Sequence, residues 1–454
     1  MANRIPRIIR ILLTIIVVAA AVFLACNRTI FVLEILYPMF MMTVASMVLI
    51  LFSLRPRLED AAFAVCLTLL HGAVAFMFFD LPYHNVNWPA FAGFSCFWIL
   101  CIRTIWEKGS ERKWLVYATV SAILLLTVES AAATVMLYTE KLHPKVLDLF
   151  LYSFDGSLGI QFSFISGMAF SKWPLLRSVS MTFYEGLPVA ITLICARHLA
   201  ARTGKVLSVL TALIFTGPIG VLFYNLFPAL GPGLVAQLGF PFKVLTRAQM
   251  MNLAVVQIAA PGPRNAIPSL HMAWVLLIWW YSRGLSFWTR AIALSFVVFT
   301  VASTLGSGQH YFIDLVVGVP FAVFVEALCS FHLPWADRRR LLALACGLGA
   351  TLCWLAALRF ATPLFWISPV VPWGLIAATI LLSWFYERGL QSAQASLSTP
   401  EAELAIGRMP DDANAAHVGP FSLANGRGFE KLGEDSPAQD SPVAIHSSSG
   451  KQRD

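Results

Sequence analysis

Long apolar runs, close to the length of a membrane crossing, are the feature that most constrains what this chain can fold into. About twenty helical residues are needed to cross a hydrocarbon core of ~30 Å. Hydrophobic residues make up 58% of the chain and charged residues only 12%, whereas soluble domains are roughly half apolar and a quarter charged. Because a backbone in lipid must satisfy its own hydrogen bonds, such runs must be helices. The sequence therefore predicts an all-α, polytopic membrane protein.

The apolar runs predict about twelve transmembrane helices. A further segment, residues 158–171, is rich in Ser and Gly and too short to cross, which indicates a re-entrant or interfacial piece. The predicted spans are 8–26, 30–54, 60–79, 90–106, 114–138, 178–197, 206–226, 269–282, 289–306, 311–331, 341–360 and 366–386.

The placement of Lys and Arg, which give a net charge of +8, predicts the orientation in the membrane. These residues lie in short loops and at helix ends rather than in a basic stripe, which argues against nucleic acid as a partner. If the N-terminus with Arg4, Arg7 and Arg10 is cytoplasmic, the strongly basic short loops also fall inside, as the positive-inside rule requires. We therefore expect a protein of the cell (inner) membrane with both termini in the cytoplasm.

Three ionisable residues stand at the ends of predicted spans. His271 opens one span, and His310 and Asp314 open another. The last two are four residues apart and share one helix face. The predicted orientation places both span ends at the same, non-cytoplasmic side. Ionisable groups in such places are costly and often functional, so we expect these three side chains to converge at one membrane surface.

Two imidazoles and one carboxylate are suited to phosphoryl transfer. One His can attack phosphorus, a carboxylate one turn away can hold its tautomer, and the second His can protonate the leaving oxygen. His310 with Asp314 fits the nucleophile pair, and His271 fits the acid. Helix N-termini favour a bound phosphate, and Arg264 and Ser269 can add charged and hydroxyl donors.

The motifs around these residues resemble those of a known family. Pro268-Ser269-Leu270-His271 and the stretch Gly308–Gly318 look like the second and third motifs of the type 2 phosphatidic acid phosphatase superfamily. Leu270 and the sequence His310-Tyr311-Phe312-Ile313-Asp314 resemble the corresponding motifs of its inositol phosphorylceramide synthase branch. The stretches Tyr152–Phe164 and Tyr224–Pro232 also resemble that branch. The resemblance covers about residues 148–332, less than half of the chain.

The resemblance implies a metal-independent enzyme that works through a phosphohistidine and needs no cofactor. His310 would be the nucleophile, Asp314 its orienting residue and His271 the acid or base, while Asp155 and Tyr224 are candidate substrate contacts. The phosphatases' first motif, a Lys and an Arg-Pro, is absent, because Lys243 and Arg247 lie at the wrong spacing; their third-motif Ser-Arg is here Ser-Thr. These departures favour the synthase branch and leave Arg264 as the candidate phosphate clamp.

The expected function is that of a lipid phosphotransferase or phosphatase acting at the non-cytoplasmic face on a membrane-embedded phospholipid or lipid phosphate. The lipid, the choice between transfer and hydrolysis, and the oligomeric state stay open. The expected regions are an N-terminal region of about five spans at 1–140, a six-helix catalytic domain at 145–332, two spans at 333–386 and a disordered cytoplasmic tail at 387–454.

Other interpretations compete with this hypothesis. Each of the three polar residues could merely cap a helix, and two His with an Asp could bind zinc, although no third nitrogen or sulfur ligand is nearby in the sequence. Twelve spans would also suit a transporter, which would place its site at the midplane between paired halves; no internal repeat supports this. A catalytically inactive protein with the same fold is the third alternative.

Overall fold

The computed structural model describes residues 10–15, 17, 38–79, 87–235, 239–257 and 262–396. Most of these residues are helical, and one short antiparallel pairing joins β1 (Lys145–Val146) to β2 (Val256–Gln257). The chain divides into two compact units, Met1–Thr399 and Pro400–Asp454, and the second lies outside the described residues. The predicted span at 8–26 also lies mostly outside them.

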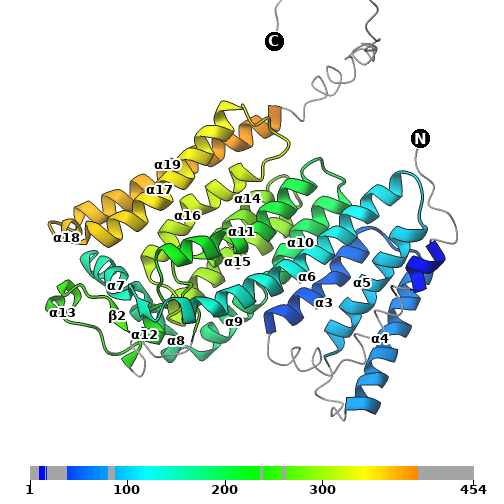
Figure 1. The fold of residues 1–454 in the computed structure, drawn as a ribbon, viewed down its shortest axis with the longest axis horizontal. Coiled ribbons are helices and arrows are strands. Elements are labelled where there is room, and N and C mark those ends of the chain that lie inside the picture. Colours follow the sequence, from blue (N-terminus) through cyan, green and yellow to red (C-terminus); the bar gives the residue numbers. More distant parts are fainter. Residues whose placement is uncertain are drawn as a thin grey trace, which may run out of the picture. The chain divides into compact units, whose positions relative to one another are not determined.

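Four helices of the N-terminal region lie in the described residues from Pro38 onward: α3 (Pro38–Ser53), α4 (Leu58–Phe79), α5 (Trp88–Trp106) and α6 (Ser110–Leu142). Helix α3 packs against α5 and against α10 (Leu187–Ala200) of the next region. A buried hydrogen bond of 2.8 Å from Ser46 Oγ to Thr192 Oγ1 joins α3 to α10. Figure 1 shows these blue and cyan helices beside the green ones.

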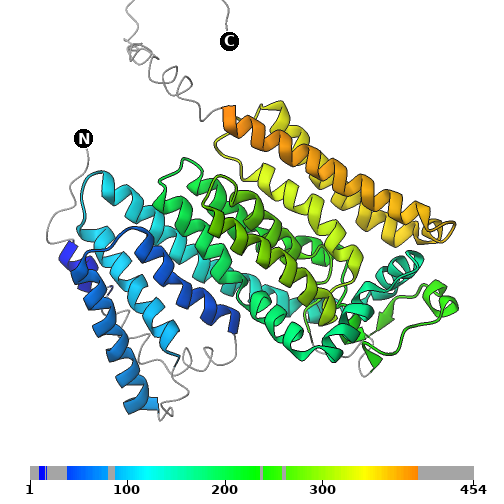
Figure 2. The same ribbon diagram turned by 180° about the vertical axis from the view of Figure 1, so that it is seen from behind.

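The central region combines long packed helices with short helices at one end. Helices α10, α11, α14, α15 and α16 run side by side, and α7, α8, α12 and α13 gather at one end of them (Figures 1 and 2). Buried apolar side chains of α11, α14 and α16 fill the centre of the main core. The bounds in this region are α7 (Asp148–Ser157), α8 (Phe162–Lys172), α9 (Pro174–Glu185), α11 (Val206–Leu226), α12 (Pro232–Val235), α13 (Arg247–Met251), α14 (Leu270–Tyr281), α15 (Phe287–Gly306) and α16 (Phe312–Leu328).

Three helices follow: α17 (Arg338–Phe360), α18 (Thr362–Phe365) and α19 (Val370–Ser396). Helix α19 runs through Glu387, where the tail was predicted to begin, so residues 387–396 are helical. Glu387 is fully buried and pairs with Arg283. This buried ion pair explains why the helix continues beyond the apolar run.

The structure does not support the count of about twelve spans. Within the described part of the chain, six helices are long and apolar enough to cross a membrane, or seven if α9 and α10, which meet at 50°, form one bent span. Helices α3, α14 and α16 contain 16, 12 and 17 residues, fewer than the roughly twenty needed for a full crossing. Counting each apolar run as a crossing overlooked that a buried helix in a large bundle is also apolar.

Candidate active site

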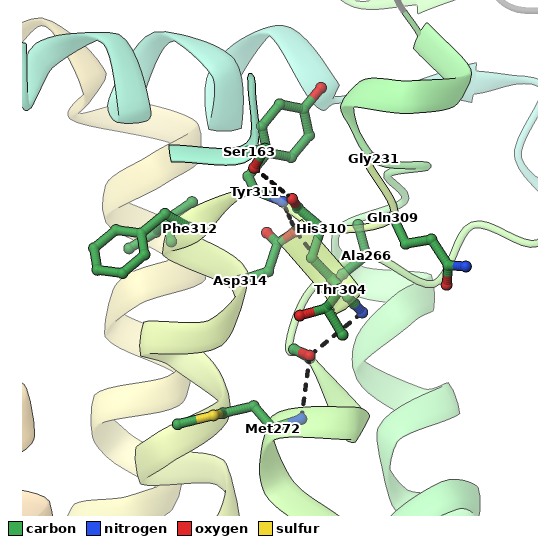
Figure 3. Close-up of polar contacts among 12 residues, drawn as sticks. Ser163, Gly231, Ala266, Met272, Thr304, Gln309, His310, Tyr311, Phe312 and Asp314 are labelled. Carbon is green, nitrogen blue, oxygen red and sulfur yellow. Dashed lines mark hydrogen bonds and ion pairs between the residues drawn. The ribbon is translucent and has the colours of Figure 1, made fainter. Parts of the chain in front are cut away.

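His310 lies in the short connection between α15 and α16, and its backbone is held from two sides. Its N–H donates to the carbonyl of Thr304 at 3.2 Å, and its own carbonyl accepts a hydrogen bond of 2.7 Å from Ser163 Oγ. Figure 3 shows this connection above the start of α14. The side chain is 3% exposed, so the imidazole is fixed inside the protein.

The hydrogen bonds of the His310 ring define which nitrogen is free for chemistry. Nδ1 lies 2.8 Å from the carbonyl oxygen of Ala266, and a carbonyl can only accept, so Nδ1 carries the proton. Nε2 then presents its lone pair, 3.3 Å from Ser269 Oγ. Burial lowers the pKa of His310 to about 4, although the bond to Ala266 opposes this shift. The imidazole is therefore neutral at pH 7, the form that a nucleophile requires.

His271 stands at the start of α14 and faces His310. The two imidazole centroids are 5.7 Å apart. Ser269 caps α14 by accepting a hydrogen bond from Met272 N at 3.3 Å, and its own N–H donates to the Asp314 carbonyl at 3.0 Å. This second bond ties the start of α14 to the first turn of α16, which brings the two histidines together.

Two carboxylates hold the first turn of α16. Asp314 Oδ2 accepts from Tyr311 N at 2.7 Å and lies 3.5 Å from His310 Nδ1. Asp155, from α7, accepts from Phe312 N at 2.8 Å and from Ile313 N at 3.2 Å. Acidic caps satisfy the free N–H groups of a helix start and favour its dipole. Both oxygens of Asp155 are thus used by the backbone, although the sequence suggested this residue as a substrate contact.

Burial opposes the charge on Asp155. It raises the pKa of this carboxyl well above its ordinary value, while the N–H groups of Phe312 and Ile313 act in the other direction. A buried carboxylate is tolerated where such donors meet it. We therefore assign Asp155 to the support of the α16 start.

Asp148 is a further supporting residue, which sequence reasoning missed. It accepts from Gly231 N at 2.8 Å, from Leu230 N at 3.1 Å and from the Tyr311 hydroxyl at 3.3 Å. Gly231 has φ of +105°, and a Cβ there would lie 2.2 Å from the Gln309 carbonyl. Burial raises the pKa of Asp148 to about 6, against the effect of the two backbone donors. No local pattern marks Asp148, because its partners lie far along the chain.

Arg264 and Tyr224 lie in the walls of the site. Arg264 is buried, and its guanidinium donates to the carbonyls of His143 at 3.0 Å and Gly262 at 2.8 Å. It thereby ties the end of α6 to the loop that presents the Ala266 carbonyl to His310. Tyr224 is buried in α11, with its phenol beside the backbone of Leu270. The structure thus joins His310, His271, Ser269 and Asp314, while the other predicted residues surround them.

The basic residues of the preceding loop are engaged elsewhere or contribute no described contact to His310. The Arg247 guanidinium lies over the Trp366 ring at 5.1 Å. Among the described residues, no three His, Cys, Asp or Glu side chains are arranged to hold a metal ion.

Comparison with known proteins gives a family match but no individual relative. No curated protein and no solved structure matches the chain. Residues 149–328, which include α7 to α16, match the family model of the PAP2 superfamily. The part of the chain that carries His271, His310 and Asp314 is therefore similar to the PAP2 superfamily.

Proposed function

We propose that this protein is a lipid phosphatase or phosphotransferase that works through a phosphohistidine at His310. One observation carries the proposal: the Nδ1–H of His310 is bound by the Ala266 carbonyl, so the neutral ring keeps its Nε2 lone pair. That nitrogen lies beside Ser269 Oγ, and the imidazole of His271 is its neighbour. A second ring close to the nucleophile is what an acid for the leaving group requires.

The proposed reaction has two steps. In the first, Nε2 of His310 attacks phosphorus, the bond from phosphorus to the leaving oxygen breaks, and His271 gives that oxygen a proton. In the second, water or an acceptor hydroxyl attacks phosphorus, its proton passes to His271, and the nitrogen–phosphorus bond breaks. Water gives hydrolysis and an acceptor hydroxyl gives transfer, so the same residues serve both outcomes.

The other residues have supporting roles in this proposal. Ser269 donates its hydroxyl proton toward the reacting centre, and Asp314 and Asp155 fix the α16 turn that carries the nucleophile. Arg264 sets the loop that binds Nδ1 and is the candidate phosphate clamp, while Tyr224 lines the wall beside Leu270. The apolar bundle would hold the acyl chains, with the phosphate at the non-cytoplasmic face of the inner membrane and both termini in the cytoplasm.

The branch is a finer proposal. The sequence His310-Tyr311-Phe312-Ile313-Asp314, together with Leu270 before His271, supports the proposal that the protein is a relative of the inositol phosphorylceramide synthases. Such a relative would transfer a phospho-head-group to a lipid hydroxyl rather than release it to water. Parallel assays with and without an alcohol acceptor distinguish the two reactions.

The test uses the full-length protein purified in detergent. We would incubate it in EDTA with a panel of phospholipids and lipid phosphates, with and without acceptors, and search for an acid-labile phosphohistidine by mass spectrometry. We expect head-group release or transfer, lost in His310→Ala and His271→Ala and kept in His332→Ala, whose ring contacts Ser208 away from the site. Full turnover in His310→Ala would reject the nucleophile, and loss of turnover in EDTA alone would indicate a metal.

A further inference from the structure

Tyr184 lies near the end of α9 and contacts both histidine-bearing segments. Its ring stacks on the imidazole of His271, with 4.3 Å between the centroids and 22° between the planes. Its hydroxyl donates a hydrogen bond to the Oε1 of Gln309, the residue directly before His310. One side chain therefore joins the histidine of α14 to the loop that carries the other histidine.

The surrounding fold fixes Tyr184 in this position. The neighbouring Phe183 stacks on Phe299 of α15, with 4.7 Å between ring centroids. Helix α9 ends at Gly186, where a Cβ would lie 2.8 Å from the Thr182 carbonyl, and α10 continues at an angle of 50°. Tyr184 itself is buried. The aromatic packing and the bend together direct the ring toward His271.

We propose that Tyr184 is a positioning residue, which holds the His271 imidazole in the orientation that proton transfer to the leaving group requires. This inference rests on the proposed function and extends it to a residue of α9. Trp274 and His310 meet the imidazole edge-on at 5.9 and 5.7 Å, so the parallel contact with Tyr184 sets the plane of the ring. We do not assign Tyr184 as the acid, because its hydroxyl already donates a hydrogen bond to Gln309 and is directed away from the imidazole that it stacks on.

Burial, and after it the charge of the neighbouring His310, lower the pKa of His271 to about 3. The acid therefore needs contacts that favour its charged form, and the stacked phenol supplies one. The face of an aromatic ring attracts a cation within about 6 Å, and His271 must be an imidazolium when it protonates the leaving oxygen. Among the described residues, the titratable side chains in ring contact with His271 are Tyr184 and His310. Replacing the phenol with an aliphatic side chain therefore removes an interaction that stabilises the protonated acid.

Two substitutions at Tyr184 separate its ring from its hydroxyl. Tyr184→Leu removes the stacking face, and we expect kcat to fall by up to about 10²-fold with little change in KM. The alkaline limb of the kcat profile should move down by about half to one pH unit. Tyr184→Phe keeps the face and should restore most of kcat and the position of that limb. An unchanged kcat and pH profile in Tyr184→Leu would overturn the proposal.

The link to Gln309 is tested separately. Gln309→Ala removes the acceptor of the Tyr184 hydroxyl, so it should lower kcat to the same small extent as Tyr184→Phe. The two changes combined should be no worse than either alone, because they remove one shared interaction. Additive losses would show that Tyr184 and Gln309 act independently and would reject this link. These mild variants also test the proposal if Tyr184→Leu does not fold.

A readout without turnover distinguishes this inference from the proposed function. The rate at which diethyl pyrocarbonate modifies His271, measured by mass spectrometry, should rise in Tyr184→Leu and stay near the wild-type rate in Tyr184→Phe. Tyr281→Leu is the matched control, because Tyr281 is also buried and lies at the far end of α14. An equal His271 rate in wild type and Tyr184→Leu overturns the positioning role, whereas a wild type inactive on every lipid rejects the proposed function alone.

Discussion

The two ends of α16 both bury charged groups, but they use them differently. At the start, Asp155 and Asp314 accept hydrogen bonds from backbone N–H groups of the first turn. At the other end, Arg340 from α17 donates to the carbonyls of Ala327 at 2.9 Å, Leu328 at 2.8 Å and Leu333 at 2.7 Å. Both arrangements complement the helix dipole, so capping alone does not distinguish a catalytic end from a structural one.

The two ends of α16 differ in the ionisable side chains that lie beside the capping residues. At the far end, Arg283 of the α14–α15 connection pairs with Glu387 of α19, and Gln391 of α19 donates a hydrogen bond of 2.9 Å to Glu326 of α16. At the start, Nε2 of the neutral His310 ring lies 3.3 Å from Ser269 Oγ, and the imidazole of His271 is its neighbour. The start of α16 therefore differs from the far end by its pair of neighbouring imidazoles, because both ends bury ionisable groups.

The largest expected contrast is between His310 and Arg340. His310→Ala should lower turnover by more than about 10³-fold, since loss of a nucleophile removes the covalent path. The melting temperature in detergent should change little, because one ring is lost while the α16 caps remain. Kinetics and thermal unfolding of the same preparations check both quantities. If His310→Ala keeps its turnover, the start of α16 is no more involved in catalysis than the far end, and the comparison fails.

The converse change is Arg340→Met. It removes a guanidinium that serves three carbonyls and lies 3.7 Å from the centre of the Trp335 ring. Leaving buried carbonyls without donors should lower the free energy of unfolding by on the order of 3 kcal/mol. Thermal melting should report this loss, while turnover per folded molecule stays near that of the wild type. A variant that melts normally but has lost turnover would show that the far end acts in catalysis.

A smaller effect is expected for Asp155→Asn, which keeps the volume and one acceptor but loses the charge. A helix cap contributes about 0.5–2 kcal/mol, and 1.4 kcal/mol corresponds to about tenfold in rate. We therefore expect kcat to fall by up to about tenfold with KM nearly unchanged. Glu387→Gln is the matched change at the far end and should leave kcat unaltered. A rise in KM alone in Asp155→Asn would instead indicate direct contact with substrate.

The smallest expected effect concerns pH. Burial lowers the pKa of His310 to about 4, and the nucleophile is the neutral ring. Lowering the pH from 7 to about 5.5 should therefore leave its contribution to kcat/KM intact, and the loss should come only as the pH approaches 4. A pH profile of the wild type, with Asp148→Asn measured in parallel because Asp148 has a pKa of about 6, checks this. A limb near 6.5 that persists in the variant would contradict a desolvated His310.

The proximity of His310 to Asp314 was predictable from local spacing, because the two are four residues apart, although His310 lies in the connection before α16 rather than in the helix. The all-helical architecture followed equally from the apolar runs. The number of membrane crossings did not, since α14 and α16 are apolar over fewer residues than a crossing needs. Apolar composition identifies what is removed from water but does not separate lipid-facing helices from helices buried by their neighbours.

The support of the site could not be predicted. The Nδ1 partner expected for His310 was Asp314, yet the Ala266 carbonyl is the closer acceptor. Every residue has a backbone carbonyl, so the sequence cannot indicate which carbonyl binds Nδ1 of His310. Only the structure identifies it. The contacts of Asp148 and Tyr184 bridge segments more than eighty residues apart, and no spacing rule covers such distances.

The bond from α7 to α16 also has a consequence for how the protein is made. Asp155 is synthesised 157 residues before Phe312, the amide that it caps, and an unpaired carboxylate is costly to bury. Until Phe312 and Ile313 have been made, the carboxylate of Asp155 lacks the donors that it has in the folded protein, so α7 can take up its buried position only after the start of α16 exists.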